Sequence, residues 1–159
     1  RGNLNGVFNS TMQTNLSMVL LSHNQFTGSL PDELFLLPSL TVIEAGANCI
    51  RNNPLTKNIC EATNLQTIAL DGMFSSPHCR ESVFPGDHRT YQLTSSLQNG
   101  VDPCIYALPN LITLHLSSNG LTGQLPEVVN FAPSFTNLGL SHNFLVGNIP
   151  TGFQTRSWA

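Results

Sequence analysis

Charged side chains are scarce in this chain of 159 residues, with 6 Lys and Arg, 9 Asp and Glu, and a formal net charge of −3. A nucleic-acid-binding surface needs clustered Lys and Arg to neutralise phosphates, so we expect no nucleic-acid partner. Hydrophobic residues nevertheless make up 40% of the chain. This composition argues against intrinsic disorder, which goes with high net charge and few apolar residues.

Long apolar runs are also missing. No segment approaches the ~20 apolar residues that a helix needs to span a bilayer, so we expect no membrane span in this chain. The sequence begins at Arg1 without an initiator methionine or a signal peptide, and we expect a processed or partial chain. The length suits one domain and not two, which predicts a single domain over residues 1–159.

A repeat of about 24 residues dominates the sequence. Segments 15–31, 110–126 and 134–150 read NLSMVLLSHNQFTGSLP, NLITLHLSSNGLTGQLP and SFTNLGLSHNFLVGNIP. Leu40 follows Leu16 by 24 residues, so a further copy begins near residue 39. Self-similarity at a fixed period is typical of a solenoid, in which each unit buries its apolar face against its neighbours.

An interval of 46 residues separates Leu65 from Leu111. Reading back from Leu111, Ile105 and Leu108 occupy the offsets that the apolar residues of segment 34–37 hold before the second repeat. We therefore predict two units in this interval rather than one repeat with an insertion. The predicted repeats start near residues 15, 39, 64, 87, 110 and 134, after a partial repeat over residues 1–14.

The pattern resembles the plant-type leucine-rich repeat, LxxLxLxxNxLxGxIPxxLxxLxx, of receptor-like proteins, receptor-kinase ectodomains and similar algal proteins. The match is specific in three copies and weaker in the middle ones. The resemblance implies an α/β solenoid: a right-handed superhelix with a parallel β-sheet on the concave face and 3-10 turns and short strands on the convex face. One of these short strands is expected near each Thr-Gly pair.

Alternate residues of each LxxLxL segment should point into the core, because the side chains of a strand have a period of two. The asparagines that end the strands are expected to bond the backbone of adjacent turns. This ladder would comprise Asn24, Asn48, Asn119 and Asn143.

The residues between the core positions should form an exposed concave face. Our leading hypothesis is an extracellular recognition module that binds a protein, peptide or glycan there. Because the face is nearly uncharged, we expect binding to depend weakly on salt. The candidate binding residues are Met18, Leu20, His23, Glu44, Thr67, Asp71, Thr113, His115, Asn137 and His142.

A second hypothesis is a structural glycoprotein that assembles end to end. Solenoids need caps at their ends, and the sequence shows no Cys-rich cap at either one. Head-to-tail stacking of copies would cover such ends and give a homo-oligomer or filament. Phe153 and Trp158 either cap the last repeat or meet a partner.

The sequence offers little for catalysis. His115 and His142 lie near Ser117 and Ser141 on the predicted face, but no carboxylate of these two repeats falls there to orient a histidine. We expect no enzyme activity and no cofactor. Zinc needs three or four converging ligands, which the histidines do not supply, so we expect no metal site. An ice-binding face would need threonines at the same position of successive strands, and the sequence does not have this regular pattern.

Four cysteines allow three pairings, which sequence alone cannot settle. We favour Cys49–Cys60, within one repeat, and Cys79–Cys104, across the irregular third and fourth units.

Two N-x-S/T sequons begin at Asn9 and Asn15. Together with the cysteines and the resemblance, they predict N-linked glycans and a secreted or extracellular chain.

Segments 73–79 and 84–89 break the repeat pattern and concentrate charge. Loops that depart from a rigid scaffold often carry binding function. The alternative, to which we give equal weight, is that these segments have no binding function and that a disulfide stabilises a repeat that departs from the pattern.

Overall fold

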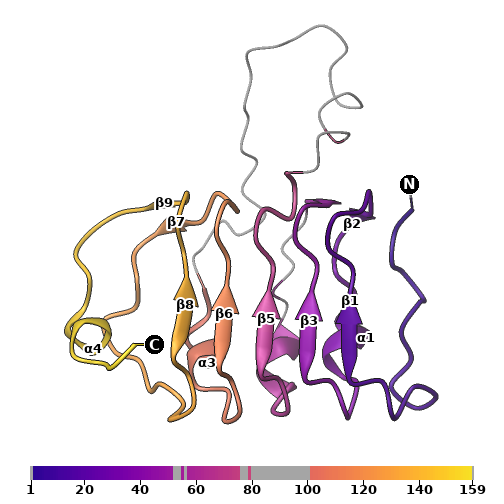
Figure 1. Ribbon diagram of the computed structural model, residues 1–159, viewed down its shortest axis with the longest axis horizontal. Coiled ribbons are helices and arrows are strands. Elements are labelled where there is room, and N and C mark those ends of the chain that lie inside the picture. Colours follow the sequence, from indigo (N-terminus) through magenta and orange to yellow (C-terminus); the bar gives the residue numbers. More distant parts are fainter. Residues whose placement is uncertain (1, 52–54, 56, 76–78, 80–100, 159) are drawn as a thin grey trace, which may run out of the picture.

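A computed structural model describes residues 2–51, 55, 57–75, 79 and 101–158. One side of the molecule is a five-stranded parallel sheet in the order β1-β3-β5-β6-β8 (Figure 1). In the first four of these strands the middle residue is buried and both of its neighbours are partly or fully exposed, as a period of two requires. The strands are β1 (Met18–Leu20), β3 (Val42–Glu44), β5 (Thr67–Ala69), β6 (Thr113–His115) and β8 (Asn137–Gly139).

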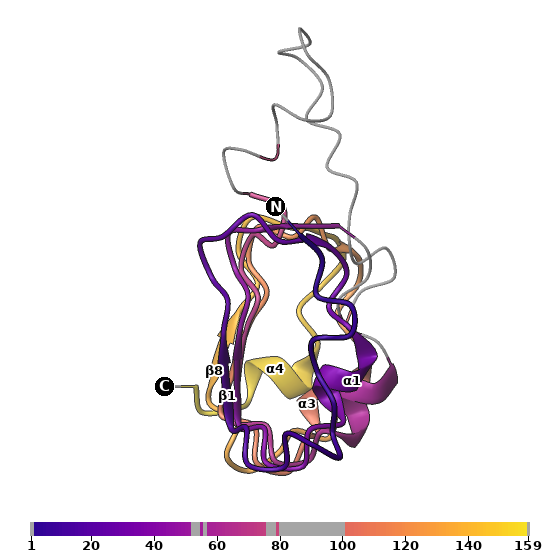
Figure 2. The same cartoon turned by 90° about the vertical axis from the view of Figure 1, so that its right-hand side faces the viewer.

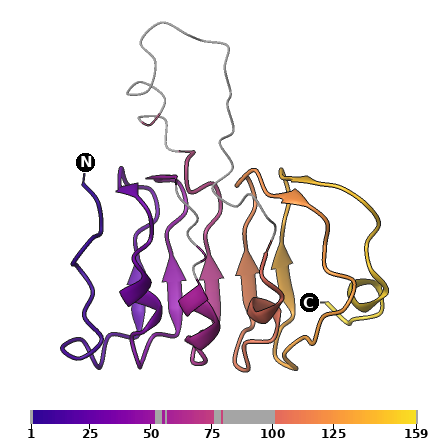
Figure 3. The same ribbon diagram turned by 180° about the vertical axis from the view of Figure 1, so that it is seen from behind.

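Short helices lie on the side opposite the sheet (Figures 2 and 3). They are α1 (Asp32–Phe35), the 3-10 helix η1 (Lys57–Glu61) and α3 (Pro103–Tyr106). Helix α4 (Thr151–Gln154) lies beyond β8, at the C-terminal end of the solenoid (Figure 1). Along a third edge, β2 (Thr27–Gly28) pairs with β4 (Cys49–Ile50), and β7 (Thr122–Gly123) pairs with β9 (Phe144–Leu145). The predicted solenoid and its short strands at the Thr-Gly pairs are confirmed, although three of the four helices are α-helical rather than 3-10.

The core is a stack of equivalent apolar residues from successive repeats. Leu40, Leu65, Leu111 and Phe135 are each at most 1% exposed. Each such residue contributes roughly 1.5–3 kcal/mol on burial. Leu16 is only partly buried, because it leads into β1, which is the edge strand of the sheet. None of the helices in the described ranges is long and apolar enough to cross a membrane.

The interval between Leu65 and Leu111 forms one repeat with an insertion. Strand β5 pairs directly with β6, with Ile68 opposite Leu114, so no further repeat places a strand between them. The predicted unit starting near residue 87 is therefore wrong, and residues 87–100 themselves lie outside the described residues. Helix α3 takes the place that α1 and η1 hold in earlier repeats, so Ile105 closes the third repeat instead of a fourth.

Residues 2–14 pack against the first repeat. Gly2 forms a parallel bridge with Phe26, and the amide of Thr27 donates to the Gly2 oxygen at 2.9 Å. Leu4 and Phe8 are buried and extend the core. The step of 24 residues from Gly2 to Phe26 equals the repeat length, as expected for a partial repeat.

An aromatic cluster covers the core at the last repeat. The ring of Trp158 lies edge-on to Phe135 with 5.6 Å between centroids, and its indole N–H donates to the Phe153 oxygen at 2.8 Å. The guanidinium of Arg156 lies 5.0 Å from the centroid of Phe131, and its Nε donates to the Phe135 oxygen at 2.8 Å. Of the two roles considered for Phe153 and Trp158, the chain thus shows the capping one.

Candidate functional site

The outward side of the five-stranded sheet, which we call the strand face, carries two aligned rows of side chains. The helices lie on the opposite side (Figure 2), and no described element covers the face. Strand register defines the rows. One row is Met18, Val42, Thr67, Thr113 and Asn137; the other is Leu20, Glu44, Ala69, His115 and Gly139.

The face is apolar at β1 and carries at least one polar side chain on each strand from β3 to β8. Met18 is 52% exposed and Leu20 is 58% exposed, and the two side chains lie on the same strand and the same face. Leu20 stands directly opposite Glu44 in the register of β1 and β3. An apolar patch therefore borders the first carboxylate of the face.

A chain of polar contacts crosses the middle of the face at the carboxyl ends of the strands. His115 Nε2 lies 3.1 Å from the Asn137 Oδ1, and His115 Nδ1 lies 3.8 Å from the Asp71 Oδ2. The other oxygen of Asp71 accepts the backbone N–H of Ser117 at 2.5 Å. The expectation concerned carboxylates of the last two repeats alone. The carboxylate beside His115, that of Asp71, comes from the third repeat, because β5 pairs directly with β6.

This arrangement is suited to binding more than to nucleophilic catalysis. A serine nucleophile needs its hydroxyl at an imidazole nitrogen that can take the proton. In the cluster, Nε2 of His115 faces the amide of Asn137, and Nδ1 faces Asp71. Both imidazole nitrogens thus face neighbouring polar side chains of the sheet.

Two of the candidate binding residues lie beyond the strands. His23 and His142 follow β1 and β8 in the left-handed region, with φ of 60° and 56°, and both are exposed. Ala47, Gly72 and Ser118 hold the equivalent position with φ of 52°, 57° and 59°. The histidines therefore stand at the rim and not in the rows. Sequence reasoning missed this turn, because only one repeat has a glycine there.

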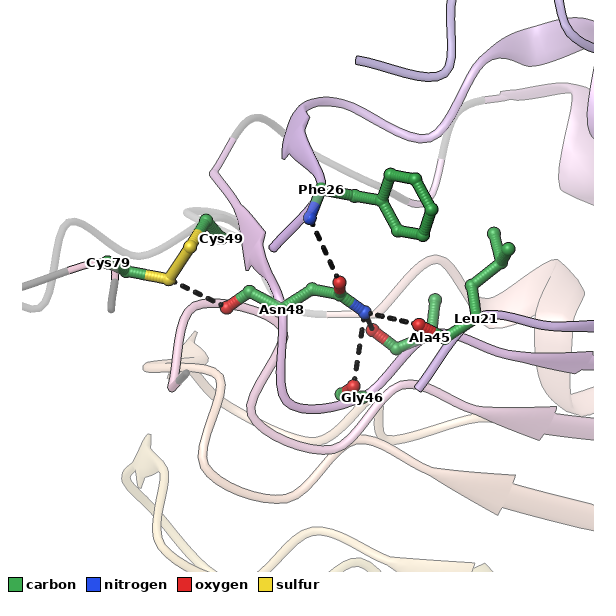
Figure 4. The surroundings of a disulfide bond; sticks show 7 residues. All are labelled: Leu21, Phe26, Ala45, Gly46, Asn48, Cys49 and Cys79. Carbon is green, nitrogen blue, oxygen red and sulfur yellow. Dashed lines mark hydrogen bonds between the residues drawn. A yellow bond between two sulfur atoms is a disulfide. The ribbon is translucent and has the colours of Figure 1, made fainter. Parts of the chain in front are cut away.

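The predicted ladder asparagines bond the backbone of their own and adjacent repeats. Asn48, which is fully buried, donates from Nδ2 to the oxygens of Leu21 at 2.8 Å and Ala45 at 2.9 Å (Figure 4). Its Oδ1 accepts the N–H of Phe26 at 3.2 Å. Asn119 and Asn143 bond in the same way, whereas Asn24 is exposed and bonds only within its own repeat in the contacts described.

The ladder is interrupted in the third repeat, where Met73 takes the asparagine position. The Met73 side chain is buried, and its backbone supplies the bonds instead. Its oxygen accepts the N–H of Ile50 at 2.9 Å, and its N–H donates to the Asn119 Oδ1 at 3.0 Å.

A disulfide stands next to this interruption. Cys49 is joined to Cys79, whose sulfur lies 3.2 Å from the Asn48 backbone oxygen (Figure 4). The loss of a side-chain amide from the ladder thus coincides with a covalent link between the same two repeats.

Both disulfides join the second repeat to the third, and the predicted pairing was wrong. The bonds are Cys49–Cys79 and Cys60–Cys104, with Cα atoms 5.4 and 5.7 Å apart. A solenoid stacks equivalent elements of successive repeats, so η1 with Cys60 packs beside α3 with Cys104. Cys49, in contrast, lies in β4 at another edge of its repeat.

One group of potential metal ligands comes together in the described part of the chain, namely Cys60, Asp102 and Cys104. Its two sulfur atoms form a disulfide. Asp102 caps α3, because its Oδ1 accepts the Cys104 N–H at 2.9 Å. The group is therefore accounted for by a disulfide and a helix cap.

Both sequon asparagines are exposed. The Oδ1 of Asn9 accepts the hydroxyl of Thr11 within the sequon at 2.7 Å, and Asn15 is exposed although Leu16 beside it packs on the core. Of the two irregular segments, residues 76–78 and 84–89 lie outside the described residues.

Comparison with known proteins identifies the repeat. Residues 15–37 and 110–131 match the family model of the Leucine Rich Repeat. The chain is 30% identical over 137 residues to the leucine-rich repeat receptor protein kinase MSL1 of Oryza sativa subsp. japonica. It is 29% identical over 146 residues to receptor-like protein 35 of Arabidopsis thaliana. These alignments cover 86% and 87% of this chain, but only 8% and 15% of the two relatives.

Solved structures show the same fold. A crystal structure of a TDR receptor matches 88% of this chain with a TM-score of 0.66, and a plant ice-binding protein matches 96% with a TM-score of 0.70. The chain covers 20% and 41% of these structures, and both are 24% identical to it. At this identity the likeness shows the fold alone.

Proposed function

We propose that this plant-type leucine-rich-repeat solenoid is an extracellular recognition module that binds a protein or peptide partner on its strand face. The observation that carries the proposal is the open face itself, on which two rows of side chains from five aligned strands are presented by a rigid core. Relatives named as receptors and receptor-like proteins support a recognition role. The two disulfides support an oxidising, extracellular compartment.

End-to-end assembly has less support. The argument for it was an uncovered solenoid end, and the rings of Trp158 and Phe153 pack over Phe135 and Phe131 of the last repeat. A single copy of the chain thus covers this part of its own core.

Selection of peptides tests the proposal. Random dodecapeptides displayed on phage would be selected on the purified protein, and the recovered peptides synthesised and titrated by fluorescence anisotropy. Thr113→Tyr places a ring at the centre of the strand face, and Asn130→Tyr places the same ring at an exposed position away from the sheet. Thermal unfolding would verify that both variants fold.

We expect Thr113→Tyr to weaken binding at least tenfold, in line with a ring that blocks a buried contact, and Asn130→Tyr to leave it unchanged. Equal affinities for the two variants, or no peptide enriched over an unrelated protein, would show that the strand face is not the recognition surface.

A further inference from the structure

We infer that the strand face selects an extended peptide in which a cationic side chain lies two or three residues from an apolar one. The cation would sit between Glu44 and Asp71, and the apolar residue would rest on Met18 and Leu20. This inference depends on the proposed function and specifies the chemistry of the ligand.

The small side chain of Ala69 separates the two carboxylates, and Gly46 lets the backbones of the second and third repeats approach closely. In the strand register, Ala69 stands between Glu44 on β3 and His115 on β6. Asp71 follows Ala69 by two residues, and its neighbour on the second repeat is Gly46, where an added Cβ would come 2.6 Å from the Asp71 backbone oxygen. Glu44 and Asp71 are thus one strand and two residues apart, or roughly 8 Å between Cα atoms. An ammonium or guanidinium over Ala69 can reach both.

Asp71 is held in place for such a contact. One of its oxygens accepts the Ser117 N–H at 2.5 Å, which fixes the carboxylate without neutralising it. The other oxygen faces outward beside His115, and the Asp71 side chain is 46% exposed. A fixed, half-exposed carboxylate loses little freedom when it binds a cation.

The two arginines whose side chains the structure describes make their contacts elsewhere. Arg51 stacks on the ring of Phe74 at 4.2 Å, and Arg156 packs on the last repeat. The contacts described for the strand face include one ion-pair candidate, Asp71 with His115. A positive charge on the partner would complement these two negative charges.

The apolar patch fixes the spacing. Leu20 on β1 and Ala69 on β5 are two strands apart, about 9.6 Å at the spacing of a sheet. An extended peptide advances about 3.3 Å per residue. Three residues of an extended ligand cover this distance. Side chains two residues apart share one face and lie about 6.6 Å apart, and the length of a Lys or Arg side chain covers the rest, so we expect a spacing of two or three residues.

The test repeats the dodecapeptide selection on the wild type and on the Glu44→Gln/Asp71→Asn variant. A matched control, Glu33→Gln/Glu127→Gln, removes the same charge from exposed positions away from the strand face. We expect Lys or Arg to be enriched two or three positions from an apolar residue on the wild type and the control, but not on the face variant. Half-exposed ion pairs are weak, so replacing this Lys or Arg by Gln should lower wild-type affinity about three- to tenfold. Affinity should also fall a few-fold between low and high salt.

Two results would overturn the inference. Peptides that lose binding with Thr113→Tyr but show no cation preference would leave the proposed function intact and refute the ligand chemistry. Peptides that bind the wild type, Thr113→Tyr and the Glu44→Gln/Asp71→Asn variant equally well would refute both. Thermal unfolding of the face variant would separate a lost contact from a lost fold.

Discussion

Single side chains at the ends of the strands join neighbouring repeats. Asn48 is the clearest case, because its buried amide bonds the backbone of both the first and the second repeat. Asn24 has the same sequence position but is exposed and donates only within its own repeat in the contacts described. Asparagine at the same repeat position therefore contributes differently to the free energy of unfolding in the two repeats.

Asn48→Ala should lower the free energy of unfolding by about 2–3 kcal/mol, because several buried backbone groups lose their partner. Asn24→Ala should cost less than about 1 kcal/mol, since water replaces the lost bonds. Urea denaturation of both variants gives the comparison, and equal losses would contradict the ladder.

Tyr106 shows the opposite situation. Its ring is fully buried among Phe131, Phe135 and Phe153, and its hydroxyl finds no partner among the described residues. Burial raises the pKa of Tyr106 well above its usual value, because the phenolate would be desolvated. Phe35 fills the equivalent place in the first repeat without a hydroxyl.

Tyr106→Phe should therefore leave the protein equally stable or raise its unfolding free energy by about 1 kcal/mol. Because the pKa of Tyr106 is higher in the folded than in the unfolded state, ionisation of this phenol does not change the free energy of unfolding below pH ~10. At higher pH the unfolded chain loses the proton first, and the free energy of unfolding falls. Thermal unfolding from pH 8 to 11 should then show a smaller alkaline loss for Tyr106→Phe than for the wild type. A marked destabilisation at neutral pH would instead indicate a hydrogen-bond partner for the hydroxyl.

At the scale of elements, the repeat period predicted the sheet well. Alternation of apolar residues in LxxLxL was enough to place Val19, Ile43 and Leu114 in the core, because one inward face is all that a three-residue strand offers. The helical segment that ends a repeat does not show which strand precedes it. Ile105 fits the repeat pattern equally well if it ends a fourth repeat of its own or if it ends the third repeat after an insertion.

The same uncertainty in the order of strands affected the candidate site. Alternation of side chains within each strand identifies the outward residues, so Glu44, Thr67 and Thr113 were placed correctly on the strand face. The contact between Asp71 and His115 depends on which strands are neighbours, and an extra repeat in the prediction separated them. The disulfide pairing depends on the same neighbour relation.

Peptide mapping tests the pairing. Cleavage after Arg51, Lys57, Glu61 and Arg80 by trypsin with Glu-C protease places the four cysteines in separate peptides. We expect the peptide with Cys49 linked to that with Cys79, and the peptide with Cys60 linked to that with Cys104. Mass spectrometry without reduction identifies the linked masses, and a Cys49–Cys60 product would contradict the stacked arrangement.

For the whole molecule, the two sequons lie close together near one end of the solenoid, and the capping aromatic cluster lies at the other. A glycan at Asn9 or Asn15 would leave the middle and far strands of the strand face uncovered. Glycosylation is therefore compatible with binding of the cation between β3 and β5, whereas a glycan at Asn15, three residues before Met18, would stand beside the apolar patch of β1.

Expression in a secretory host should yield a chain heavier than its sequence mass, with two discrete losses of mass on partial deglycosylation. Thr11→Ala should remove one glycan and Ser17→Ala the other, because each change destroys one sequon. Ser10→Ala keeps the Asn9 sequon and is the control. Intact-mass spectrometry reads all three, and an unmodified wild type would show that neither acceptor is used.

The two disulfides hold both ends of the insertion to the second repeat, Cys79 before it and Cys104 after it. A protease cut after Arg89 would divide the polypeptide into two fragments that stay bonded through Cys60 and Cys104. The fragments would also remain aligned, since β5 and β6 keep their own backbone bonds. A nicked molecule can thus persist as one covalent body with its sheet intact, and only a reducing environment would let the halves part.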